Sequence, residues 1–196
     1  MSPPPSSMLV RMVRCSFLHA DTYEEVEADK SSIVQATVVV FLAAVSAGLG
    51  AWLETFSWHP AYSDSLDLAF EVTARSIEPL ALWVGGAAFA FMVGSSFFRG
   101  RETQTDYAEV LRTTGFAFTP GLFSVLAVLP PAALGTGVMW VFRLWMLLAV
   151  MIAVRQALDF TTGRAIGTVL VGWVLGWLVM WGLVSVTLQV LDLVGI

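Results

Sequence analysis

The sequence predicts an all-α fold: a polytopic transmembrane helical bundle of about five spans, with an N-terminal amphipathic interfacial helix. Three observations lead to this class. Hydrophobic residues make up 57% of the chain and charged residues only 13%, whereas soluble domains carry about 25% charged residues. The mean hydropathy is +0.78. The apolar residues gather in long runs, and a helix needs about 20 such residues to cross a bilayer.

The chain divides into two regions. Residues 1–30 are expected to form a tail with an amphipathic segment and an acidic linker, and residues 31–196 a membrane domain of five spans. In the tail, residues 8–19 place apolar side chains over most of a helical wheel and leave Arg11 and Arg14 on the remaining face. This pattern is typical of a helix in the headgroup region with its arginines toward anionic lipid, and equally of a helix that packs against protein. We expect the acidic linker to be solvated.

Five apolar runs follow the tail. The expected spans cover about 33–53, 77–98, 115–134, 138–158 and 165–194. Pro120 falls early in the third run, and it is easiest to accommodate if a helix starts near Thr119 with the proline at its first position. The last run is longer than one crossing needs, so we expect that helix to tilt or to extend out of the hydrocarbon.

Small residues recur at helical spacing in the first and last spans. Ala43, Ala47 and Ala51 form a seam that lets a neighbouring helix approach closely. Gly172 and Gly176 form a GxxxG pair, which would seat a helix of this chain or of a second protein. Five helices can bury only some of these faces. Because the last span is terminal, we expect its glycine face to remain available for a partner.

Arg143, inside the fourth span, is the most informative single residue. Burying an arginine in a span costs a few kcal/mol, so its side chain either pairs inside the bundle or snorkels to the headgroups. The candidate partners are Glu78 and Glu71, whose segment lies at the same membrane face. Arg75 lies between these carboxylates at helical spacing, so the sequence predicts a charge cluster at this face.

A second polar group closes the fourth span. Arg155 and Asp159 lie four residues apart and would pair along one helix face, and Arg164 follows the next turn. These residues predict a solvated junction between two helices, or alternatively a docking point for a cytosolic or membrane partner.

The basic residues predict the orientation, because Lys and Arg near span ends favour the cytoplasm. With a cytoplasmic N-terminus, the cytoplasmic segments hold Arg11, Arg14, Lys30, Arg99, Arg101, Arg112, Arg155 and Arg164. Only Arg75 falls on the opposite side. We therefore expect a protein integral to the plasma (inner) membrane, with its N-terminus in the cytoplasm and its C-terminus outside.

No catalytic, cofactor-binding or metal-binding residues are predicted. His19 and His59 fall on opposite faces of the membrane and cannot share a metal, and the single cysteine, Cys15, rules out a cysteine cluster. No GxSxG, HExxH or Walker-type motif is present. Basic and aromatic residues form no stripe for nucleic acid. Contact of a pigment or quinone with the Trp-rich last span stays open.

Three stretches of the chain carry a family resemblance. They are YEEVEADKSSIVQATVVV at 23–40, YAEVLRTTGFAFTPG at 107–121 and WMLLAVMIAVRQALDFTTGRA at 145–165. In this order they resemble the bacterial branch of the Yip1-domain family of membrane proteins, over nearly the whole chain. The resemblance implies a five-span helical domain. In eukaryotic relatives it also implies binding of small trafficking GTPases, but the chain lacks their Asp-Leu-Tyr-Gly-Pro motif, so that role is not carried over.

The sequence favours a scaffold or an accessory subunit of a larger membrane complex, which organises membrane or partner proteins without catalysis. Packing motifs are plentiful, and groups for acid-base work inside the bilayer are scarce. A small-solute transporter or channel component is the alternative, but only Arg143, Glu78 and Asp159 supply polarity near the spans, and no inverted repeat is evident. An enzyme is not expected. The expected partners are the lipid bilayer and other membrane proteins or a second copy of the chain.

Overall fold

The computed structural model describes residues 6–57, 65–97, 106–128 and 132–194. Within these ranges the secondary structure is entirely helical, which confirms the predicted all-α class. The elements are α1 (Met8–Ser16), α2 (Ala20–Ala28), α3 (Ser32–Ser57), α4 (Ser65–Ser96), α5 (Tyr107–Ala117), the 3-10 helix η1 (Thr119–Val128), α6 (Ala132–Ala157) and α7 (Thr162–Val194). In the described part of the chain, three helices are long and apolar enough to cross a membrane, and these stretches are Ser32–Glu54, Ser65–Ser96 and Leu134–Ala157.

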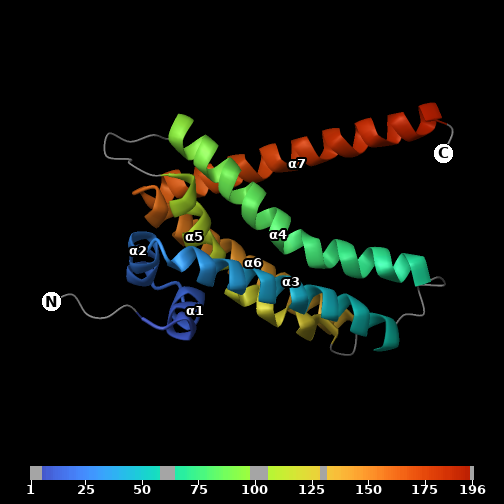
Figure 1. The fold of residues 1–196 in the computed structure, drawn as a ribbon, viewed down its shortest axis with the longest axis horizontal. Coiled ribbons are helices and arrows are strands. Elements are labelled where there is room, and N and C mark those ends of the chain that lie inside the picture. Colours follow the sequence, from blue (N-terminus) through green and yellow to red (C-terminus); the bar gives the residue numbers. More distant parts are fainter. Residues whose placement is uncertain (1–5, 58–64, 98–105, 129–131, 195–196) are drawn as a thin grey trace.

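The long helices form an elongated bundle (Figure 1). Helix α3 lies along η1, α6 packs on the other side of η1, and α4 packs across α3. Helix α5 contacts α3, α4 and α6. Helix α7 packs on α4 and α6, and its last part diverges from the rest of the bundle. The short helices α1 and α2 cover one end of the bundle, against α5 and α6.

The third apolar run is a broken helix rather than one continuous span. A capping box between Asp106 and Glu109 starts α5 at Tyr107, so the boundary expected near residue 115 is wrong. The chain then forms η1 from Thr119, with Pro120 in its first turn. At about 1.5 Å per residue for α5 and about 2.0 Å for η1, the two segments together reach the roughly 30 Å of a hydrocarbon core.

Close approach of α5 to its neighbours explains the tight middle of the bundle. A Cβ on Gly115 would lie 2.6 Å from the Cβ of Ala36 on α3 and 3.1 Å from Nε1 of Trp83 on α4. The Trp83 indole donates a 2.7 Å hydrogen bond to the carbonyl oxygen of Leu111. Only glycine fits where these three helices meet, because any side chain at this position would force them apart.

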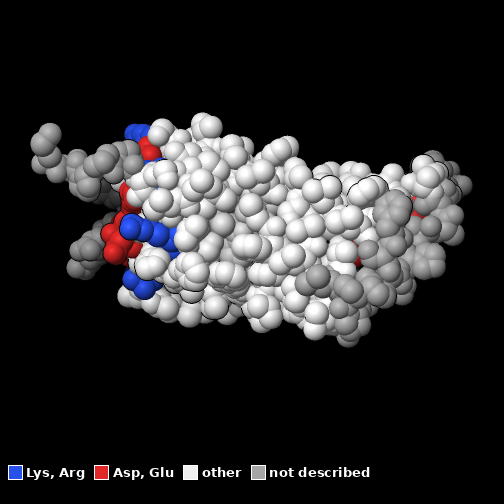
Figure 2. Space-filling model, turned by 90° about the horizontal axis from the view of Figure 1, so that it is seen from below, with Lys and Arg blue, Asp and Glu red and all other residues white. Residues whose placement is uncertain are grey.

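Charged residues gather mainly at one end of the molecule. On the face that Figure 2 shows, most of them lie at the end where α1 and α2 lie, and a long uncharged band separates them from a few acidic atoms toward the other end. Large apolar side chains of α6, Trp140, Val141, Leu144 and Leu148, are exposed. An exposed apolar surface of this extent belongs in a bilayer, and the chain is therefore an integral membrane protein.

Candidate functional site

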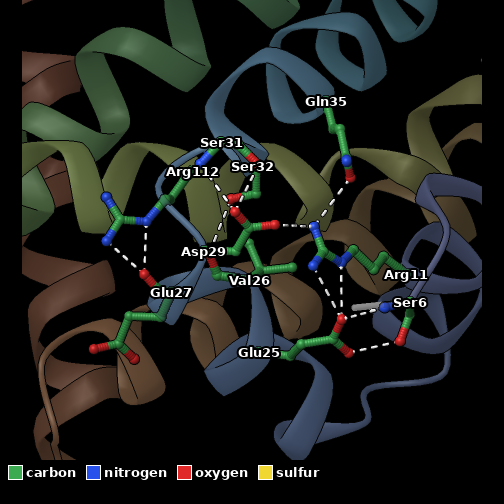
Figure 3. A network of polar contacts seen from close by, with 10 residues as sticks. All are labelled: Ser6, Arg11, Glu25, Val26, Glu27, Asp29, Ser31, Ser32, Gln35 and Arg112. Atoms are coloured by element: carbon green, nitrogen blue, oxygen red, sulfur yellow. Dashed lines mark hydrogen bonds and ion pairs between the residues drawn. The ribbon is translucent and has the colours of Figure 1, made fainter. Parts of the chain in front are cut away.

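The N-terminal helices are held onto the bundle by a buried arginine (Figure 3). The side chain of Arg11, on α1, is 0% exposed. Its guanidinium lies 3.0 Å from Glu25 and 2.9 Å from Asp29, and it donates a 3.1 Å hydrogen bond to Oε1 of Gln35 on α3. The α1–α2 hairpin is thus tied to the first long helix by its own charged groups.

The two carboxylates that form ion pairs with Arg11 are stabilised in their ionised form. Burial alone would raise the pKa of Glu25, but hydrogen bonds from Ser6 and Arg11 outweigh it and hold this pKa below its ordinary value. Hydrogen bonds from Ser31 and from Arg11 lower the pKa of Asp29. A buried guanidinium requires such partners, since an unpaired charge in a low-dielectric site costs several kcal/mol.

A second buried arginine binds the same C-terminal end of α2 from the side of α5. Nε of Arg112, on α5, donates a 2.8 Å hydrogen bond to the carbonyl oxygen of Glu27. Arg112 also lies 3.5 Å from the carboxylate of Glu109. Guanidinium groups satisfy helix-terminal carbonyls well, because they offer several donors in one plane. The arginine that the charge pattern assigned to a cytoplasmic loop therefore joins α2 to α5.

Helix α6 completes the attachment. Nε1 of Trp145 donates a 2.6 Å hydrogen bond to the carbonyl oxygen of Ser16, and the Trp145 ring lies 6.4 Å from that of Phe17. Further along, Nε2 of Gln156 donates a 2.6 Å hydrogen bond to Glu24. The hairpin is therefore bonded to α3, α5 and α6, and it forms part of the membrane domain's own packing.

These contacts decide between the two alternatives for α1 and correct one expectation. The helix packs against protein, since Arg11 is buried among protein groups, whereas Arg14 is exposed. The acidic linker is not simply solvated, because its carboxylates neutralise Arg11. The exposed side of α1 carries Leu9, Val10 and Val13 together with Arg14, and Phe17 follows directly after the helix. An exposed helix side with several apolar residues and one arginine suits the edge of a bilayer.

Three carboxylates converge beside the hairpin. Burial, together with the carboxylates of Asp159 and Glu109, raises the pKa of Glu27 to about 7. Asp159 follows the end of α6 in a left-handed conformation with φ of 51°. The junction between α6 and α7 is therefore electrostatically coupled to α2. Among the described residues, no group of His, Cys, Asp and Glu has an arrangement that would hold a metal ion.

The predicted pairing of Arg155 with Asp159 is wrong. Among the residues that the structure describes, these two form no ion pair, because α6 ends at Ala157 and Asp159 no longer lies on its face. Arg155 is half-buried, whereas Arg164 is exposed near the start of α7. The junction leaves Asp159 and Arg164 at the surface beside the hairpin.

At the opposite end, the structure brings the predicted charge cluster together. Arg143 lies 3.4 Å from Glu78, with the two side chains 47% and 44% exposed, and its guanidinium lies 5.9 Å from the Trp140 ring centroid. Arg75 lies 2.7 Å from Glu71 and 3.5 Å from Glu54. Arg143 is thus neither buried inside the bundle nor without a partner.

A groove opens beside this cluster, between α3, α4, η1 and α6. The alanine seam of α3 lines it, together with charged residues of α3, α4 and α6, and its cavity volume is about 80 Å³. Ala43 also packs against η1, since a Cβ on Gly121 would lie 3.2 Å from it. Ala43 and Ala51 are both 1% exposed, so the seam packs against neighbouring segments at its two ends, and only Ala47 between them is half-buried.

The glycine pair of α7 faces α4. A Cβ on Gly172 would lie 3.5 Å from Phe89, and one on Gly176 would lie 3.6 Å from the Phe89 ring. The expectation that this face remains available for a partner is wrong, because α4 already occupies it. Other expectations fall outside the described residues: His59, Arg99 and Arg101, and the side chains of Trp177 and Trp181.

A comparison with protein families gives one match. The family model described as the Yip1 domain matches residues 16–184. The chain belongs to the Yip1 family. Comparisons with curated proteins and with solved structures found no match.

The region that the Yip1 model matches includes only part of the buried network. It begins at Ser16, so Arg11 lies before the matched region, whereas Glu25, Asp29 and Gln35 lie inside it. Sequence reasoning missed this network in the Yip1 protein because a run of acidic residues is usually solvated. The sequence signal for the network was Arg11, which lies between apolar residues. The acidic linker that follows holds more carboxylates than its own basic residue can neutralise.

Proposed function

We propose that this Yip1-family protein is an integral membrane scaffold or accessory subunit that holds partner proteins and performs no catalysis. Its working surface is the hairpin platform, which consists of α1, α2 and the α6–α7 junction at residues 155–164. The observation that carries this proposal is the complete burial of Arg11 between the hairpin and α3. A tail that only connected a membrane domain to the cytosol would not need buried ion pairs that fix it to the bundle.

The platform offers charged groups of both signs at a fixed position. Asp21, Asp159 and Arg164 are exposed on it, and Lys30 is exposed between α2 and α3. Hydrogen bonds of Arg11, Arg112 and Trp145 hold the hairpin in place, so binding of a partner to the platform costs little conformational entropy of the scaffold. Surface charges contribute more to partner choice and association rate than to affinity, which suits a protein that recruits others.

The charge distribution supports a cytoplasmic hairpin platform in the inner membrane. Most basic residues that the structure describes lie in the hairpin, at the start of α5 or at the α6–α7 junction, whereas Arg75 and Arg143 lie toward the other end. Because basic residues favour the cytoplasmic side, we place the N-terminus there, and five crossings would place the C-terminus outside. GTPase binding is not part of the proposal.

A transporter or channel component is the second candidate, and the groove beside Arg143 favours it. The groove ends, however, near Phe118 and Met146. Beyond them the bundle is closely packed, with Gly115 against Ala36 and Trp83. The described residues thus offer no continuous polar path. Solute flux in liposomes would separate this candidate from the scaffold.

The scaffold proposal is tested by cross-linking in the native membrane followed by purification in mild detergent. We compare the unmodified protein with Asp21→Lys, which reverses a charge on the platform, and with Asp67→Lys, which makes the same change at an exposed position at the start of α4. The scaffold proposal expects a stoichiometric partner that Asp21→Lys loses and that Asp67→Lys retains. A protein that purifies alone from cross-linked membranes would refute it, as would equal loss in both variants.

A further inference from the structure

We infer that the groove between α3, α4, η1 and α6 binds one phospholipid whose headgroup carries both a phosphate and a primary ammonium, the phosphatidylethanolamine class. The site lies in the leaflet opposite the hairpin platform. Its charged mouth takes the headgroup, and its apolar floor takes part of an acyl chain.

The length of the groove matches one leaflet. On α3 its lining runs from Ala43 to Glu54. These eleven steps of an α-helix cover about 16 Å, and half of a hydrocarbon core of about 30 Å is about 15 Å. The charged side chains lie at one end of this distance and the small residues along the rest. A ligand that fills the groove must therefore have one charged end and a long apolar body.

The walls suit a flexible chain better than a rigid ring system. The floor consists of the small residues Ala43, Ala47, Gly50 and Ala51, of which Ala47 is half-buried and the others are buried. Methionine and phenylalanine side chains form much of the opposite side, at Phe118, Met139, Phe142 and Met146. Methionine is unbranched and adaptable, so this wall can follow the varied conformations of an acyl chain.

The mouth is electrically balanced. Two guanidinium groups, of Arg75 and Arg143, and two carboxylates, of Glu54 and Glu78, line the groove. The contact of Arg143 with Glu78 measures 3.4 Å, longer than the 2.7–2.9 Å of a strong charge-assisted hydrogen bond. Arg75, by contrast, is held 2.7 Å from Glu71. Arg143 and Glu78 can therefore reorient, so that Arg143 receives the phosphate and Glu78 the ammonium.

This balance selects among headgroups. A headgroup with only negative charge would leave the carboxylates of the mouth facing a second anion. A quaternary ammonium has no N–H to donate to Glu54 or Glu78, whereas a primary ammonium has three. The zwitterion with a primary ammonium is therefore the best complement to two arginines and two glutamates.

The test uses the full chain, purified in mild detergent and stripped of lipid. Phosphatidylethanolamine, phosphatidylglycerol and phosphatidylcholine with identical acyl chains are added separately. Native mass spectrometry counts bound lipids, and thermal unfolding reports the shift in Tm. The inference expects one retained phosphatidylethanolamine and the largest Tm increase with that lipid. Equal retention and equal shifts for all three lipids would overturn it, since they indicate only annular lipid.

Two variants locate the lipid. Ala47→Phe fills the groove, and Val45→Phe adds the same ring at an exposed position of α3 as a matched control. We expect Ala47→Phe to lose the retained phosphatidylethanolamine and Val45→Phe to keep it. The double variant Arg143→Gln/Glu78→Gln keeps the net charge and adds no volume, so it decides the question if Ala47→Phe does not fold. It should weaken phosphatidylethanolamine retention by about tenfold. Unchanged retention in a folded groove variant would contradict the inference.

Discussion

The indole Nε1 of Trp145 donates a 2.6 Å hydrogen bond to the carbonyl oxygen of Ser16, 129 positions earlier in the chain. This bond joins the end of α1 to the middle of α6. A carbonyl oxygen near a helix end needs such a donor when no water reaches it. The N-terminal segment, which composition alone separates from the membrane domain, is therefore part of the same packed unit.

The first prediction concerns the buried arginine. Arg11→Leu leaves Glu25 and Asp29 without their shared partner, and breaking a buried pair in this way costs about 3–5 kcal/mol. Thermal unfolding in detergent measures the loss. Arg11→Lys should recover only part of it, because one ammonium cannot replace contacts to three different side chains.

Arg14→Leu is the matched control, since Arg14 is exposed on the same helix. Its Tm should stay close to that of the unmodified protein. Equal losses in Arg11→Leu and Arg14→Leu would mean that the helix, rather than the buried network, responds to the substitution.

The second prediction is a pH dependence set by Glu27. Its pKa is raised from 4.5 to about 7, so the folded protein resists ionisation of this carboxyl. This unfavourable contribution is absent below about pH 4.5, grows as pH rises toward 7 and is complete above it. Glu27→Gln removes it. The Tm advantage of the variant should therefore increase between pH 5 and pH 8, and an advantage that does not change with pH would contradict the assignment.

The third prediction concerns the opposite end. The Arg143–Glu78 pair is about half-exposed, and exposed ion pairs contribute about 0–1 kcal/mol. Arg143→Leu should therefore lower stability far less than Arg11→Leu in the same detergent. Comparable losses would show that Arg143 is paired inside the bundle.

The fourth prediction concerns the glycine pair of α7. Alanine at Gly172 and Gly176 should be tolerated, because the added Cβ atoms would lie at ordinary contact distances of 3.5 and 3.6 Å from Phe89. Isoleucine at both positions should separate α7 from α4 and lower the Tm. If the double-isoleucine protein instead stays stable and only loses a co-purifying partner, that result contradicts the prediction and shows that this face is a partner interface.

The sequence predicts the fold class well but predicts the packing of the N-terminal tail poorly, and both outcomes have physical reasons. Hydropathy predicts helices such as α3 because a bilayer imposes length and composition together. It missed the early start of α5, where the Asp106–Glu109 capping box lies before the apolar run. The spacing rule that paired Arg155 with Asp159 assumed a continuous helix, which the left-handed Asp159 interrupts. The Arg143–Glu78 contact was among the alternatives, because both residues fall at one membrane face.

The most direct test of the docked hairpin uses the chain's single cysteine. Cys15 is fully buried, and burial raises its pKa to about 12, so almost no thiolate is present near pH 7. Maleimide should leave Cys15 unmodified in the folded protein and modify it in the denatured protein and in Arg11→Leu. Arg14→Cys in a Cys15→Ser background, one residue away and exposed, should react readily and so shows that the reagent reaches α1. Rapid modification of Cys15 in the folded, unmodified protein would contradict the account, because the hairpin would then not be docked.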